Sequence, residues 1–312
     1  MKKLVAALVL SLFSLPVLAQ PALKMMIPAN PGGGWDQTGR GLAAAMQSAK
    51  LVSSVQFDNK GGAAGIIGLA QFVNSAKGDP NAVMMGGMVM VGGIILGKSA
   101  VNLSQVTPIA RLTSEWEVIV VPAASPLKSM ADLVKMLKEN PGKVSWGGGS
   151  AGGTDHILAG LIARAVGVDP AKVNYVAFKG GGEALASILG GHVVAGVSGI
   201  GEFAEQVKAG KLRALAQSAP TKVDGIPSLK EQGIDVELGN WRGIFGAPGI
   251  TPQQRDVLVK LVKDATDSPA WKATLEKHGW TPVFLGGDDY RKFIDEDIKR
   301  VGAIIESLGL RK

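Results

Sequence analysis

Five glycine-rich segments contain the residues of this chain that are best suited to hold a ligand. They are residues 31–36 (PGGGWD), 59–65 (NKGGAAG), 86–87 (GG), 147–154 (GGGSAGGT) and 179–183 (KGGGE). Several of them follow an apolar, strand-like run and open a helical pattern. Glycine lets the backbone approach a ligand closely, and the first amides of a helix are unpaired at the positive end of its dipole. Such amides bind anions. One such segment could be a plain strand-to-helix turn, but the series indicates loops that converge on one anion.

One of these segments also offers a nucleophile. Residues 148–152 (GGSAG) fit the G-x-S-x-G elbow of serine hydrolases, with Ser150 at its centre. Such an enzyme needs a histidine, and His156 follows Ser150 too closely for the usual chain order, which leaves His192 and His278. The competing interpretation is that Ser150 and Thr154 donate hydroxyl hydrogen bonds to an anion at a helix start. This interpretation also explains the other glycine segments, so an exported serine esterase that uses Ser150 is the alternative hypothesis.

A second motif indicates a nucleotide site that the surrounding residues argue against. Residues 92–99 (GGIILGKS) fit the phosphate-binding P-loop pattern. Its interior is Ile-Ile-Leu rather than small or polar, and no helical pattern follows Lys98. The chain has no cysteine, and its three histidines lack the spacing of a zinc site. We therefore predict no cofactor and no metal.

Alternating strands and helices must position these loops. Strand patterns cover residues 25–29, 54–58, 81–86, 116–121, 144–146, 173–178, 193–197, 212–217 and 241–247, and helical patterns cover 37–47, 66–76, 129–137 and the segments around 158–165, 185–189 and 203. The alternation predicts a largely parallel sheet with helices on both faces. Ligands in such folds bind beyond the carboxyl ends of the strands, which is where the glycine loops would lie.

The order of the elements predicts two lobes. Pro122 ends one strand and a new strand–helix series follows, until a turn-rich segment at 220–227. The last section is helical, with starts at Thr251 and near Asp288, and it lacks the strands for a separate domain. We expect it to pack back on the first lobe. The fold class is thus α/β with two lobes around a ligand cleft: residues 20–121 plus 226–312 form lobe 1, and 122–225 form lobe 2.

The amino terminus predicts export. Lys2 and Lys3 precede the apolar run 4–18, and Val17-Leu18-Ala19 is a small-residue cleavage site. We expect cleavage after Ala19 and a periplasmic protein. The formal net charge is +7, but the basic residues are scattered without interleaved aromatic residues, so we predict no nucleic-acid partner.

The ordered motifs resemble a known family. Pro31-Gly-Gly-Gly-Trp-Asp, then 61–68 (GGAAGIIG), then 175–183 (YVAFKGGGE) look like the periplasmic solute receptors of tripartite tricarboxylate transporters, the Bug proteins. The resemblance covers the mature chain and is closest to the tricarboxylate (citrate) receptor branch. It implies a type II periplasmic binding fold, a monomer, that closes on a small carboxylate and presents it to a two-component membrane permease.

The resemblance also implies a set of ligand-binding residues. In lobe 1 they are Gly33, Gly34, Trp35, Asp36, Gly62, Ala63 and Ala64, and in lobe 2 they are Gly149, Ser150, Thr154, Gly181, Gly182 and Ser198. Ser198 stands where the family often has an acidic residue, which would favour an amino or hydroxyl group on the solute. Lys179 could add a cation for a more highly charged anion, or be a solvated loop residue. Trp35 could line the cleft or pack in the core, whereas Trp241 and Arg242 are expected to be structural.

Overall fold

The computed structural model describes residues 20–179 and 181–310; the predicted signal peptide of residues 1–19 lies outside this part. The strands are β1 (Ala22–Ile27), β2 (Ser54–Asn59), β3 (Ala82–Gly87), β4 (Thr107–Pro122), β5 (Ser145–Gly148), β6 (Asn174–Ala177), β7 (Ala195–Gly199), β8 (Leu212–Gln217), β9 (Gly239–Gly246) and β10 (Thr281–Gly286). The helices are α1 (Gly34–Ser48), α2 (Ile66–Ser75), α3 (Met88–Leu96), α4 (Met130–Glu139), α5 (Thr154–Ala165), α6 (Gly181–Leu189), α7 (Ile200–Lys208), α8 (Pro252–Asp267), α9 (Pro269–His278) and α10 (Gly287–Ser307).

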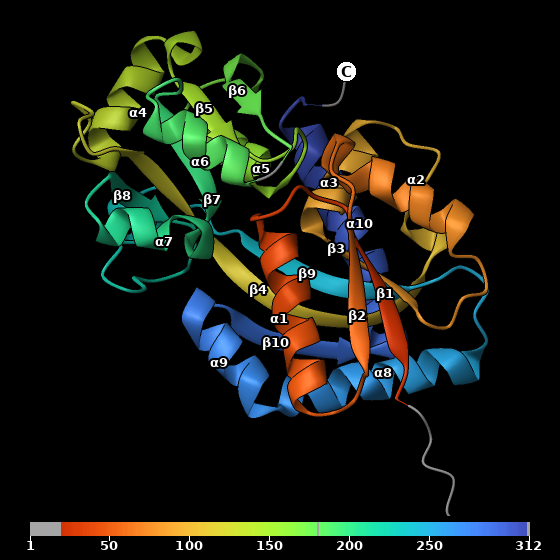
Figure 1. Cartoon of the computed structure of the whole chain (residues 1–312). Coiled ribbons are helices and arrows are strands. Elements are labelled where there is room, and N and C mark those ends of the chain that lie inside the picture. Colours follow the sequence, from red (N-terminus) through yellow and green to blue (C-terminus); the bar gives the residue numbers. More distant parts are fainter. Residues whose placement is uncertain (1–19, 180, 311–312) are drawn as a thin grey trace, which may run out of the picture.

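Two α/β lobes share the long strand β4. In the first, β1 pairs in parallel with β2 and β3, and in the second, β5 pairs in parallel with β6 and β7. The first part of β4 pairs with β9 and β10, and its last part pairs with β7 and β8. Figure 1 shows β4 running from one group of elements to the other, with β9 beside it.

The prediction of a largely parallel sheet was wrong for the strands that join the lobes. β9 is antiparallel to both β3 and β4, and β4 is antiparallel to β7, β8 and β10. Strands β4 and β9 carry the chain between the lobes in opposite directions, so they must be antiparallel to each other. The helix-crossover argument applies only within each lobe, where no crossing strand intervenes.

Capping residues set the helix starts that the sequence predicts. Ser129 accepts a hydrogen bond from the Asp132 amide at the start of α4. Thr251 likewise accepts a hydrogen bond from the Gln254 amide at the start of α8, and Pro252 occupies the first helical position. Helices α3 and α9 and strand β10 were not predicted, and β4 begins at Thr107 rather than at residue 116.

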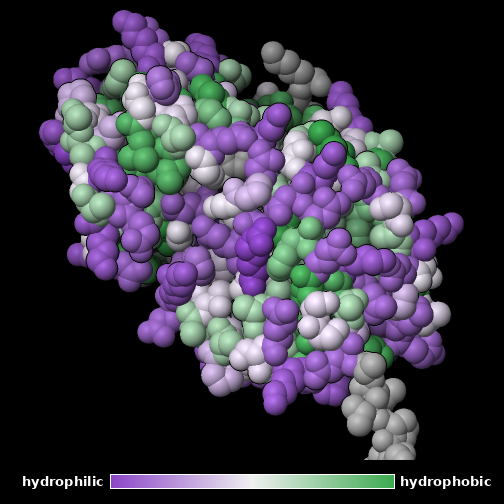
Figure 2. All heavy atoms as spheres, in the orientation of Figure 1, coloured by the Kyte–Doolittle hydropathy of each residue, from purple (hydrophilic) through white to green (hydrophobic). Residues whose placement is uncertain are grey.

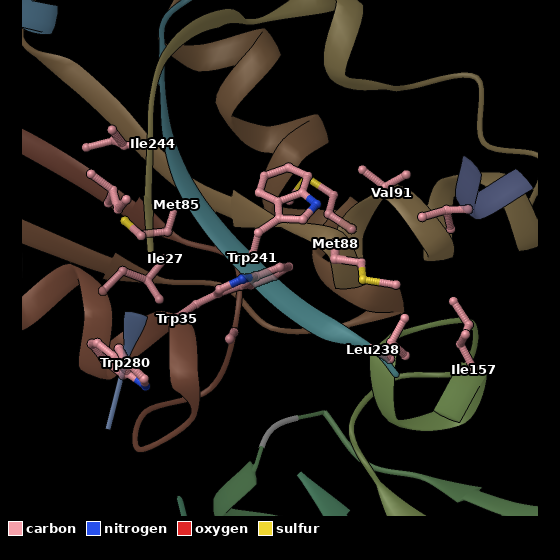
Figure 3. Packing of buried hydrophobic residues seen from close by; sticks show 14 of the residues in the cluster. Ile27, Trp35, Met85, Met88, Val91, Ile157, Leu238, Trp241, Ile244 and Trp280 are labelled. Atoms are coloured by element: carbon pink, nitrogen blue, oxygen red, sulfur yellow. The ribbon is translucent and has the colours of Figure 1, made fainter. Parts of the chain in front are cut away.

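The core forms where the predicted apolar faces meet. Leu42 and Met46 of α1 are fully buried, as their spacing predicts. Figure 3 shows Trp35 and Trp241 close together beside Met88. The indole Nε1 of Trp241 donates to Asp297 of α10 at 2.8 Å, which fixes the last helix to the crossing strand β9.

The carboxyl-terminal section packs on the first lobe, as predicted. Helix α9 packs against α1, α8 against β4, and β10 extends the sheet beside β4. The segment that precedes β9 lies beside the second lobe, where the Leu229 amide donates to the Gln217 carbonyl of β8. The predicted lobe boundaries at residues 121 and 226 stay a prediction.

The surface in Figure 2 is mainly hydrophilic, with hydrophobic residues in small groups. Between residues 20 and 310, Gly180 apart, no helix combines the length and the apolar character needed to cross a membrane.

Candidate functional site

A cavity of about 80 Å³ lies between the lobes, where their glycine loops meet the crossing strands. It is lined by Pro28, Ala29, Gly33, Gly34, Trp35, Ala64, Gly65, Val89, Glu115, Gly149, Ser150, Asp155, Lys179, Gly181, Ser198, Glu202, Asn240 and Arg242. These residues come from the ends of parallel strands in both lobes, from the first turns of the helices that follow, and from β4 and β9. Four of the five glycine-rich segments therefore meet at one hollow, as predicted, whereas residues 86–87 do not line it.

The loop before α1 brings the backbone of Gly33 and Gly34 to this cavity. Gly33 is the N-cap residue of α1 and has no side chain that could cap the helix. Asp36 does not line the cavity and accepts hydrogen bonds from the Gly32 amide, Arg40 and Asn59. Burial alone would raise the pKa of Asp36, but these hydrogen bonds and the Arg40 charge outweigh it and lower the pKa. Asp36 thus stays ionised and holds the loop in shape.

The loop before α2 is held in an uncommon backbone conformation. Ala63 and Ala64 have φ angles of 49° and 55°, in the left-handed region that glycine tolerates best. Non-glycine residues in this region cost on the order of 1–3 kcal/mol each and cluster at ligand sites. Trp35 packs directly over Gly65, where an added Cβ would lie 2.7 Å from the indole ring. The sequence left open whether Trp35 packs in the core or lines the cleft. Trp35 is buried in the core and also lines the cavity.

The loop between β5 and α5 is braced by side chains behind it. The Gly149 amide donates to Asp155 at 2.6 Å, and the hydroxyl of Tyr175 donates to the Gly149 carbonyl at 2.8 Å. The Gly152 amide donates to Nδ1 of His156, whose ring stacks on Tyr175. Burial lowers the pKa of His156 to about 4, so its ring is neutral and can accept this bond.

The structure also places the two motifs that the sequence offered as alternatives, the serine-hydrolase elbow around Ser150 and the P-loop pattern at residues 92–99. His156 is engaged with the loop amide, and among the described residues none of the hydrogen bonds made by the three histidines reaches Ser150. In the P-loop-like segment, Gly92 to Leu96 are already inside α3, so Gly97 to Ser99 follow a helix rather than open one. The geometry of a P-loop requires the reverse order.

Carboxyl groups form one wall of the cavity. Asp155 and Glu202 line it, and Glu117 of β4 is fully buried behind them, with no hydrogen-bond partner for its carboxyl oxygens in the described part of the chain. Burial, and then the charges of Asp155 and Glu202, raise the pKa of Glu117 well above its usual range. Burial raises the pKa of Asp155 to about 6, against the hydrogen bond from the Gly149 amide. Glu117 therefore holds its proton more tightly than an exposed glutamate does.

A buried ion pair joins the crossing strands beside this wall. Arg242 of β9 pairs with Glu115 of β4, and both side chains are less than 5% exposed. Trp280 donates its Nε1 hydrogen to Glu115 at 2.7 Å, and its ring lies 5.0 Å from the Arg242 guanidinium carbon. Burial lowers the pKa of Arg242 to about 9, so the guanidinium stays charged at neutral pH. Glu115 and Arg242 cancel each other's charge.

The structure brings together most of the residues that the resemblance implied. Gly33, Gly34, Trp35, Ala64, Gly149, Ser150, Gly181 and Ser198 line the cavity. Asp36, Gly62, Thr154 and Gly182 do not line it, and Ala63 lines an adjacent hollow of about 370 Å³ beside Ser150 and Lys179. The Thr154 hydroxyl is buried and has no hydrogen-bond partner in the described residues. Lys179, for which the sequence left two roles open, and Arg242, which was expected to be structural, both line the cavity.

Sequence reasoning missed the acidic wall and its neighbour Asn240. Glu115 and Glu117 alternate with Trp116 in a β-prone run, so both point to the same face of the strand, and this signal was available. Asp155 and Glu202 stand in the first turns of helices, where an acidic residue has an ordinary dipole role. No spacing shows that these two helices meet. Within the described residues, no group of His, Cys, Asp and Glu is arranged to hold a metal ion.

Comparison with known proteins identifies the family of this chain and several relatives. Residues 39–310 match the model of the tripartite tricarboxylate transporter family receptor. A UPF0065 protein of Cupriavidus necator is 29% identical, over 98% of this chain and 95% of its own length. Protein BugT of Bordetella pertussis is 27% identical, over 93% of this chain and 90% of its own length.

Solved structures share the fold. The periplasmic binding protein BugD superposes with a TM-score of 0.83 at 21% identity, covering 94% of this chain and 99% of BugD. MatC of Rhodopseudomonas palustris with bound malate gives 0.78 at 20% identity, covering 93% and 100%. An R. palustris protein with adipate gives 0.81 at 20% identity, covering 93% and 97%. The match to the family model spans most of the chain, and the protein belongs to the tripartite tricarboxylate transporter family of solute receptors, with a type II periplasmic binding fold.

Proposed function

We propose that this protein captures a small carboxylate in the periplasm by closing its lobes on it, and delivers it to the two-component permease of a tripartite tricarboxylate transporter. Citrate is the first candidate ligand, since the sequence motifs resemble the tricarboxylate branch. The observation that carries the proposal is the cavity itself. Residues in or next to the first turns of α1, α2, α5, α6 and α7 surround one hollow between the lobes.

Such a site suits a carboxylate because it offers fixed donors rather than a reactive group. Backbone amides at helix starts and the Ser150 hydroxyl can each donate to a carboxylate oxygen, and charge-assisted bonds of this kind are roughly twice as strong as neutral ones. The donors come from both lobes, so a bound anion gains its full binding energy only when the lobes approach each other. Ligand binding therefore favours the closed form by its differential affinity for that form.

Two solved structures with the same fold support small carboxylates as the ligand class. MatC contains malate and the R. palustris protein contains adipate, and both share the two-lobed fold at TM-scores near 0.8. Both ligands are dicarboxylates, so this fold accommodates small acids of different lengths. The adjacent hollow beside Ser150 and Lys179 gives room for the distal end of a longer acid.

Isothermal titration of the purified mature chain tests the proposal. The panel is citrate, tricarballylate, malate, succinate and adipate, and we expect at least one to bind. The variant Ser150→Phe, which fills the cavity, should abolish the heat while the circular dichroism spectrum is kept. Ser104→Phe, at an exposed position outside the cavity, is the matched control and should bind normally. The absence of binding by every acid in the panel would exclude the proposed function.

Export and oligomeric state are further parts of this proposal. The signal sequence predicts cleavage after Ala19, which an intact mass of the periplasmic protein measures directly. A monomer is expected by light scattering. Growth of a deletion strain on the ligand that titration identifies distinguishes transport from a sensory role.

A further inference from the structure

A hydrogen bond between two side chains joins the lobes beside the cavity. Nδ2 of Asn30, which follows β1 in the first lobe, donates at 2.5 Å to Oε1 of Glu183, in the first turn of α6 in the second lobe. Oε2 of the same carboxylate accepts from the amide of Lys179 at 3.2 Å. Lys179 lines the cavity, whereas Asn30 and Glu183 do not. The Glu183 carboxylate therefore connects a cavity-lining loop of the second lobe to the first lobe from outside the cavity.

Glycine backbone surrounds this hydrogen bond and brings its partners together. A Cβ on Gly61 would lie 2.5 Å from Oδ1 of Asn30, so the Asn30 side chain packs directly against the loop before α2. A Cβ on Gly33 would lie 3.3 Å from the Gly181 nitrogen, so the glycine loops before α1 and at the start of α6 are in close contact. Glycines have no side chain with which to fasten such a contact. The neighbouring Asn30 and Glu183 supply one.

A bond between the lobes acts on their closure. When the lobes separate, Asn30 and Glu183 must exchange this bond for bonds to water, so it stabilises only the form in which the lobes touch. Any interaction that favours one form shifts the population toward it. Opening has to break the bond, whereas the encounter of a carboxylate with the open lobes does not involve it. The bond should therefore act on the dissociation rate, where most affinity differences between related complexes lie.

We propose that Asn30 and Glu183 form a latch that holds the closed lobes together and so sets how long a bound carboxylate is retained. This inference rests on the proposed function. Both are positioning residues, because neither lines the cavity. Asn30 is half-buried and Glu183 is exposed, so water competes for the bond and its contribution is smaller than that of a buried bond to a charged group.

Removing the latch tests the inference. Stopped-flow tryptophan fluorescence gives the association and dissociation rate constants with citrate, malate and adipate, and the tightest-binding of the three is used for the variants. Asn30→Ala removes the donor, so it should raise the dissociation rate constant roughly three- to tenfold and leave the association rate constant within about twofold of native. Asn30→Asp places a second carboxylate against Glu183, and since like charges repel, it should raise the dissociation rate constant by about tenfold or more.

Reversing the latch separates it from a general effect on folding or charge. In the double variant Asn30→Asp/Glu183→Gln, the glutamine can donate to the new aspartate while its oxygen accepts from the Lys179 amide. The net charge equals that of the native pair, and the dissociation rate constant should return to within about threefold of native. Asn74→Asp makes the same change of charge at an exposed position of α2 outside the cavity, and should keep the native rate constants.

The outcomes separate this inference from the proposed function. If the native protein binds one of the acids and both Asn30 variants dissociate within about twofold of the native rate, there is no latch and the receptor function stands. An effect of Asn30→Asp that lies in the association rate constant, or that the double variant does not reverse, would also overturn the inference. If none of the acids binds to the native protein, the proposed function fails and the inference fails with it.

Discussion

Replacing Glu202 with glutamine should make the protein more stable, and increasingly so as the pH rises. The pKa of Glu202 is raised from 4.5 to about 7 in the folded protein, first by burial and then by the charge of Asp155. The folded state therefore keeps a proton that the unfolded chain has released between these two pH values. Stability is lost across this window as the pH rises, and the loss is complete above pH 7.

The size of the effect follows from the shift. Each pKa unit corresponds to about 1.4 kcal/mol, so ionisation of Glu202 costs up to about 3 kcal/mol of folding free energy. Glutamine keeps the shape and an acceptor oxygen for the Ser198 hydroxyl but cannot ionise. The variant should therefore match the native protein near pH 4.5 and exceed its stability by up to about 3 kcal/mol at pH 8.5.

Urea unfolding of the ligand-free chain at pH 4.5, 6.0 and 8.5 measures this difference. Tryptophan fluorescence and circular dichroism should give coincident transitions, which justifies a two-state free energy. Glu205→Gln, on the exposed face of the same helix, is the control and should stay within about 0.5 kcal/mol of native at each pH. If the advantage of Glu202→Gln grows by less than about 1 kcal/mol between pH 4.5 and 8.5, the carboxylate is not desolvated as argued.

Three further changes probe the buried ion pair between the crossing strands, the contact between the lobes and a helix start. Arg242→Met leaves Glu115 as a buried, unpaired carboxylate and should lower the unfolding free energy by about 3–5 kcal/mol in urea titrations; a loss below 1 kcal/mol would contradict it. Gly92→Ala places a Cβ against the Gly152 carbonyl oxygen of the facing lobe, so ligand affinity should fall about tenfold with little loss of melting temperature, and the scattering radius with saturating ligand should increase. Ser129→Ala removes the cap of α4 and should cost about 1 kcal/mol by thermal unfolding, whereas ligand affinity should not change.

The parts of the fold that depend on local chemistry could be predicted from the sequence. Glycine loops, capping residues and apolar periodicity act over a few residues. The predictions therefore placed α1 and α4 within a few residues of their observed bounds, and α8 at its observed start. Strand β10 carries Pro282 and is only partly buried, so it lacks the alternation of a strand with one buried face. It exists because the antiparallel edge of β4 is available to it. Such an edge is a tertiary feature that no short window contains.

The same division applies to the candidate site. Backbone donors were found because glycine marks them wherever they occur. The acidic groups were missed because each has an ordinary local role: Asp155 and Glu202 lie in the first turns of helices. Arg242 was considered but expected to be structural, because it lies in an apolar strand. Only the meeting of the lobes turns them into one cavity wall.

A receptor built on backbone amides has an inherent problem of selectivity, because any small anion can accept from them. The charged side chains of the cavity restrict that choice. Asp155 and Glu202 line the cavity, and carboxylates in a site of low polarity repel an anionic group placed beside them. Lys179 also lines the cavity and attracts such a group. The amides thus provide affinity for the anionic end, and the charges around them set where that end can lie.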